Sequence, residues 1–78
     1  MTNLVEASLL HIRDIDYAYM IVVHHCDNMA RSGRKSVTIA FRFREEQPSA
    51  QQFALFVDRV KRMARGEQQG VRVSYRLL

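Results

Sequence analysis

The sequence contains the same alternating pattern of residue types twice. It occurs as Val37-Thr38-Ile39-Ala40-Phe41-Arg42-Phe43 and, 34 residues later, as Val71-Arg72-Val73-Ser74-Tyr75-Arg76-Leu77. The alternation of apolar and polar residues is typical of a β-strand with one buried face. Each stretch follows the tripeptide Met-Ala-Arg after the same interval. The upstream apolar residues also agree, which indicates a duplicated supersecondary unit with repeats at 15–43 and 49–77. For a repeat this short, coincidence is the alternative.

A helix is expected upstream of the second strand. Pro48 and Ser49 open it, and Ser49 with Gln52 has the spacing of a capping box. Its apolar residues recur at helical intervals: Phe53, Phe56, Val57, Val60, Met63 and Ala64. The helix should end near Arg65-Gly66.

The first copy has the same plan, with a stop at Arg31-Ser32-Gly33 and with Asp14 or Asp16 as the capping residue. Its stripe has the same offsets: Tyr19, Val22, Val23, Cys26, Met29 and Ala30. Residues 17–25 are also rich in aromatic and β-branched side chains, so a strand there is the alternative.

A further strand is expected at residues 5–11, with Val5, Ala7 and Leu9 pointing inward. Asn3 and Glu6 also have capping-box spacing, so a short helix is the alternative. The sequence therefore predicts one small domain, 1–78, of the α+β (two-layer α/β) class. Its order is β-α-β-α-β, with two helices packed on one face of a three-stranded sheet.

The opposite face of this sheet is less clearly defined as a solvent face. It should carry Glu6, Ser8, Leu10, Thr38, Ala40, Arg42, Arg72, Ser74 and Arg76. Small residues and a leucine mix there with three arginines. An open surface, a dimer contact and an anion-binding platform all fit this composition.

Composition places the chain among ordinary globular proteins, with 47% apolar and 26% charged residues. The single cysteine, Cys26, excludes an internal disulfide and fits a reducing compartment. No secretory signal is visible, and the longest apolar run, Tyr17 to Val23, is too short to cross a bilayer. We expect a cytoplasmic protein without membrane contact.

Charge is distributed unevenly along the chain. Residues 31–78 carry eleven Lys and Arg against four Asp and Glu, a net +7, whereas residues 1–30 carry one Arg against four acids, a net −3. Such an asymmetry suggests an anionic partner, although a soluble surface without a partner explains it equally well. The candidate contacts with an acidic protein or a nucleic acid are Arg31, Arg34, Lys35, Arg42, Arg44, Arg72 and Arg76.

Nucleic-acid binding lacks one usual element, since Phe41, Phe43 and Tyr75 fall on the core face and leave no aromatic stacking platform. Any such binding should rely on phosphate contacts and be independent of sequence.

Apolar residues on the outer faces of the helices favour a protein contact instead. Tyr17, Met20 and Ile21 project sideways or outward from the first helix, and Leu55 from the second. If residues 17–25 form a strand, this cluster is divided between two faces.

Candidate catalytic and metal sites are weak. In His24-His25-Cys26-Asp27, only His24 and Asp27 share a helix face, and Cys26 belongs to the apolar stripe. The acid pairs Asp14/Asp16 and Glu45/Glu46 fit caps and turns. We therefore expect a non-enzymatic interaction module without metal, cofactor or small-molecule ligand, with a protein partner or a homodimer favoured over nucleic acid.

Overall fold

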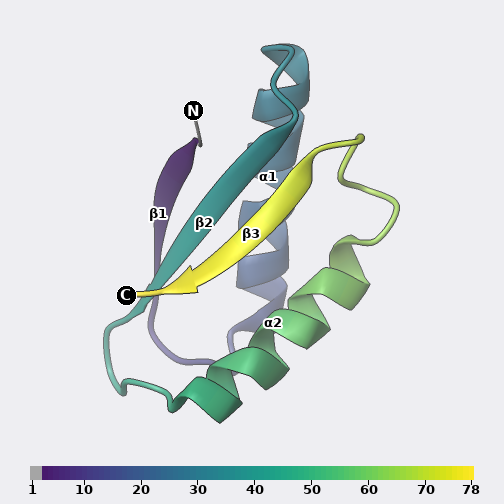
Figure 1. Cartoon of the computed structure of the whole chain (residues 1–78). Helices are drawn as coiled ribbons and strands as arrows, with labels where there is room; N and C mark the ends of the chain where they lie inside the picture. Colours follow the sequence, from purple (N-terminus) through teal and green to yellow (C-terminus); the bar gives the residue numbers. More distant parts are fainter. Residues whose placement is uncertain (1–2) are drawn as a thin grey trace.

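The computed structural model describes residues 3–78 and shows three strands alternating with two helices (Figure 1). The strands are β1 (Leu4–Leu9), β2 (Ser36–Phe43) and β3 (Arg72–Leu77), and the helices are α1 (Ile15–Arg31) and α2 (Ala50–Ala64). The order of elements confirms the predicted β-α-β-α-β fold, and it makes residues 17–25 helical and the segment around Glu6 a strand.

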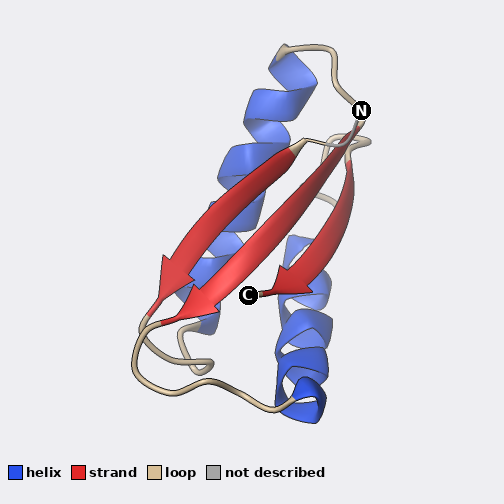
Figure 2. Ribbon diagram, turned by 60° about the vertical axis from the view of Figure 1, so that its left-hand side comes forward, coloured by secondary structure: helices blue, strands red, loops and turns tan. Residues whose placement is uncertain are grey.

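The sheet has the order β1-β2-β3, and both strand pairs are parallel. Leu4 pairs with Thr38 and Leu9 with Phe43 on one side of β2, while Ser36 pairs with Arg72 on the other. Both helices lie on the same face of the sheet, so that the opposite face is uncovered (Figure 2). The predicted arrangement, with two crossover units sharing the middle strand, is therefore present.

The ends of the helices follow the predicted signals, with one difference. Ser49 and Gln52 form both hydrogen bonds of the capping box at α2. At α1 the N-cap residue is Asp14, but its side chain makes no capping bond and instead accepts a hydrogen bond from the backbone N–H of His11 at 3.0 Å. The carboxylate therefore fixes the loop between β1 and α1. After α1 the chain turns at Gly33, whose φ of 72° suits glycine.

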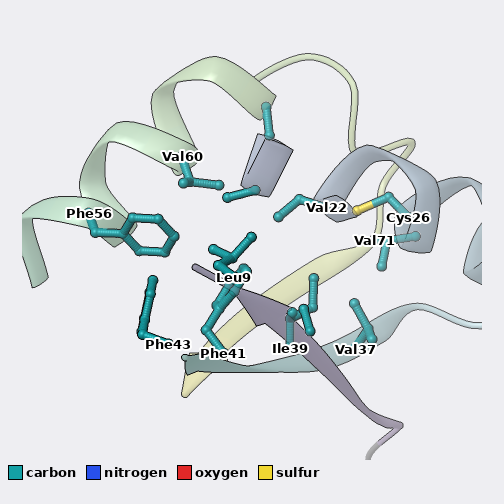
Figure 3. Packing of buried hydrophobic residues seen from close by; sticks show 13 residues of the cluster. Leu9, Val22, Cys26, Val37, Ile39, Phe41, Phe43, Phe56, Val60 and Val71 are labelled. Atoms are coloured by element: carbon teal, nitrogen blue, oxygen red, sulfur yellow. The ribbon is translucent and has the colours of Figure 1, made fainter. Parts of the chain in front are cut away.

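The core lies between the helices and the sheet (Figure 3). The helices contribute Ala18, Val22, Cys26, Phe56, Val60 and Ala64, and the strands contribute Ala7, Leu9, Val37, Ile39, Phe41 and Phe43. Val71, which directly precedes β3, completes the core. The inward side chains of β2 are almost completely covered, whereas Val73, Tyr75 and Leu77 of β3 are only half-buried. The two helices thus cover the centre of the sheet better than its β3 edge.

Candidate interaction surface

The uncovered face of the sheet is the most unusual surface of the molecule. All-parallel sheets are nearly always covered on both faces. Here the second face bears, besides the residues expected from the sequence, Leu4 and Ser36. We call this surface the open face. Its centre is formed by small residues, and Leu4 and Leu10 are exposed at its margin.

The charges of the open face are placed by the strand register. Glu6, Ala40 and Arg76 form one row across the three strands. Glu6 lies 3.7 Å from the guanidinium of Arg42 on β2, and both side chains are mostly exposed. Within residues 3–78, Arg72 and Arg76 are in no ion pair. The β3 side of the open face therefore keeps two guanidinium groups available for an anionic partner.

The other basic residues predicted as contacts lie outside this face. Arg31 is at the end of α1, where it pairs with Asp27 at 3.0 Å. Arg34 donates a hydrogen bond to the side chain of Asn3, and Arg44 is exposed just after β2. The carbonyl of Lys35 accepts a hydrogen bond from the N–H of Arg72 at 2.8 Å, and Lys35 and Arg34 line a hollow with Ala30 at the amino end of the sheet. The basic residues therefore do not form one patch, and only Arg42, Arg72 and Arg76 lie on the open face.

The four apolar residues predicted as an interface differ in their exposure to solvent. Tyr17, Met20 and Leu55 are exposed by 57, 63 and 62%. Ile21 is half-buried and packs against the core. Leu55 borders a groove of about 280 Å³ that it shares with Ile12. Met20 is therefore a better position than Ile21 for testing a contact, because its substitution leaves the core intact.

A second groove runs between α2 and β3 and was not predicted. It has a volume of about 530 Å³ and is lined by Phe53, Ala54, Val57, Asp58, Lys61, Val73, Ser74 and Tyr75. The ammonium of Lys61 lies 5.7 Å from the centre of the Tyr75 ring, and burial raises the pKa of Tyr75 to about 12. The sequence feature that indicates this groove is the apolar side of β3. An edge strand has a neighbour on one side only, so its apolar side is left partly uncovered.

The single cysteine and the three histidines differ in burial: Cys26 lies in the core, His24 is exposed, and His11 and His25 are partly buried. Cys26 is fully buried, and burial raises the pKa of its thiol. No group of three or more His, Cys, Asp or Glu side chains suited to a metal ion occurs in residues 3–78. His11 lies 3.9 Å from Glu46, because the two residues follow the carboxyl ends of neighbouring parallel strands. Neither helix in this part of the chain is long and apolar enough to span a membrane.

Protonation of His25 is expected to lower the stability of the fold in mild acid. Burial, and secondarily the charge of His24, lowers its pKa below the ordinary value of 6.5. Protonation therefore favours the unfolded chain, so this contribution is complete above pH 6.5 and is lost as the pH falls through the lowered pKa. We expect His25→Gln to reduce the decrease in the free energy of unfolding between pH 7.5 and pH 5, measured by urea denaturation. His24→Gln is the control and should keep most of the decrease; equal pH dependence of wild type and His25→Gln would contradict the assignment.

Comparison of the chain with protein-family models, curated proteins and solved structures gave no match. The surfaces described above are therefore the basis for inferring what the protein binds.

Proposed function

We propose that the protein is a small non-enzymatic interaction module that self-associates and binds an acidic protein surface through its open face. The observation that carries the proposal is the uncovered face of an all-parallel sheet, on which Arg72 and Arg76 form no ion pair with any of the described residues. Guanidinium groups match carboxylates in geometry as well as in charge.

The centre of the open face supports contact with a protein. Thr38, Ala40 and Ser74 are small, so a partner backbone can approach the sheet closely there. Leu4 and Leu10 add apolar area at the margin. This combination of a small-residue centre, arginines and marginal leucines suits a folded or extended polypeptide with carboxylates.

Nucleic-acid binding is the second candidate, and the position of Lys35 favours it. Lys35 and Arg34 are exposed at the amino end of the sheet, where the backbone of Lys35 is hydrogen-bonded to that of Arg72. Such exposed basic side chains suit a phosphate backbone. The aromatic residues argue against base recognition, because Phe41 and Phe43 are buried in the core and Tyr75 is half-buried on the helix side.

Binding to model anions tests the proposal. Fluorescence anisotropy would measure the affinity for a labelled poly-glutamate peptide, for duplex DNA and for single-stranded RNA, each at low and physiological salt. The double variant Arg72→Glu/Arg76→Glu should bind the peptide at least about tenfold more weakly, since charge reversal turns attraction into repulsion. The control Arg13→Glu/Arg59→Glu changes the net charge equally at exposed positions outside the open face and should bind like the wild type.

Two results would count against the acidic-protein proposal. One is the absence of peptide binding even at low salt. The other is preferential, steeply salt-dependent binding of DNA or RNA that the open-face variant loses, which would make nucleic acid the target.

A further inference from the structure

The outer edge of β3 has free backbone hydrogen-bonding groups. In the described part of the chain, residues 3–78, β3 pairs only with β2, and no other strand lies beside it (Figure 2). The N–H groups of Arg72 and Leu78 donate to the carbonyls of Lys35 and Phe41. Because successive residues of a strand direct their backbone groups to opposite sides, the N–H and C=O groups of Val73, Tyr75 and Leu77 point to the free edge.

The side chains of the same three residues lie on the helix side of the sheet and are half-buried. Val73 and Tyr75 also line the groove beside α2. At the opposite edge of the sheet, Ala7 and Leu9 of β1 are already buried on this side. The β3 edge thus combines unpaired backbone groups with uncovered apolar area, which exposed sheet edges in soluble proteins usually avoid.

We propose that a second copy of this chain covers the β3 edge, with the two β3 strands antiparallel about a twofold axis at Tyr75. The result is a continuous six-stranded sheet of order β1-β2-β3-β3-β2-β1. This inference rests on the self-association in the proposed function but not on the acidic partner.

The arginines of the open face select this register. With the axis at Tyr75, Arg76 of one copy lies opposite Ser74 of the other, and Arg72 lies opposite Leu78. An axis at Ser74 would place Arg72 opposite Arg76 twice, and an axis at Arg76 would place two copies of Arg76 face to face. Like charges directly opposite each other destabilise a strand pair. Shifting the axis to Val73 or Leu77 would shorten the paired segment, so Tyr75 combines full pairing with a register in which no two arginines are directly opposite each other.

The groove beside α2 suits a second copy as well. In the Tyr75 register, Val73 of each copy meets Leu77 of the other, and the antiparallel pair forms about six N–H···O=C bonds. The flank of α2 along the groove bears Asp58 and Lys61 beside Val57. A second β3, which bears apolar residues on the same side, therefore complements both the backbone edge and the groove.

A proline substitution tests the edge. The N–H of Val73 points to the free edge and has no partner among residues 3–78, so Val73→Pro should leave the monomer folded while removing a donor from the dimer contact. Sedimentation velocity across micromolar concentrations should show a wild-type dimer and at least about a tenfold weaker association for the variant. Glu6→Pro is the matched control, because its N–H points to the free edge of β1, and it should remain dimeric. Circular dichroism would establish that both variants are folded.

Disulfide trapping tests the register. Co-refolding Ser74→Cys with Arg76→Cys places cysteines opposite each other, with Cα atoms about 4.5 Å apart, within the range of a disulfide. Each variant alone places its own cysteines diagonally, about 7–8 Å apart, where a bridge is unfavourable. Mild oxidation should therefore yield covalent dimer in the mixture and little in either variant alone. Cys26 is present throughout and fully buried.

Three outcomes would overturn the inference: a wild-type monomer at all concentrations, a dimer that resists Val73→Pro, or efficient trapping by Ser74→Cys alone. Peptide binding by the monomeric Val73→Pro variant separates the proposals. If that variant still binds poly-glutamate, the open face acts without the dimer; if the wild-type dimer does not bind it, the acidic partner is wrong and the dimer stands.

Discussion

Replacing Phe41 by alanine is expected to lower the free energy of unfolding by about 3–5 kcal/mol, as is typical for truncating a buried aromatic side chain. Phe41 is fully buried at the middle of β2. Its ring lies 5.3 Å from that of Phe56, in an edge-to-face arrangement, and 6.3 Å from that of Tyr75. The substitution therefore removes the contact that joins α2 to the central and outer strands.

The expected loss is large for a domain of 78 residues, whose total stability should be about 4–12 kcal/mol. Urea denaturation followed by circular dichroism would measure it. Phe41→Leu is the control and should cost clearly less, because it keeps most of the buried volume. A loss below about 1 kcal/mol for Phe41→Ala would mean that the aromatic cluster is not packed as described.

The thiol of Cys26 should react with a water-soluble thiol reagent at least about 10³-fold more slowly in the folded protein than in urea. Cys26 is fully buried, and burial raises the pKa of its thiol, so both access and thiolate are reduced. Opening of the fold must precede reaction, and each 1.4 kcal/mol of opening free energy slows labelling about tenfold. Labelling kinetics at pH 8 would measure the protection.

The Phe41→Ala variant provides the matched comparison for this second experiment. If Cys26 reacts only after global unfolding, the variant should lose protection by the factor that its loss of stability predicts. Unchanged protection would instead assign labelling to a local opening of α1. Equal rates in folded and unfolded wild type would show that the packing of α1 on the sheet is wrong.

The sequence was sufficient for the fold because each element carries its own signal. The capping box at Ser49 and the alternation in residues 71–77 both depend on neighbours within a few positions. The same holds for the predicted stripe of α1, of which Val22 and Cys26 are buried; Ala18 is buried as well but was not predicted as part of the stripe. Where two signals competed, as in residues 17–25, the helical period prevailed because that face packs against the sheet.

The surfaces depend on distances between elements, which periodicity does not report. The pairing of Glu6 with Arg42 requires the register between β1 and β2. The groove at Tyr75 requires the position of α2 above β3. For the same reason the sequence could place Ile21 beside the apolar stripe but could not show that the core partly covers it.

The parallel order of the strands has a consequence for synthesis of the chain. β2 pairs with residues 34 positions earlier and 36 positions later, as in Leu4 with Thr38 and Ser36 with Arg72. At about 5–20 residues per second, the second edge of β2 remains unpaired for on the order of 2–7 s after it is made. During that interval the strand with the most buried residues in the final fold, including Ile39, Phe41 and Phe43, exposes backbone groups to any other nascent chain. Early folding of β1, α1 and β2 would therefore leave this edge of β2 open to incorrect pairing until β3 is made.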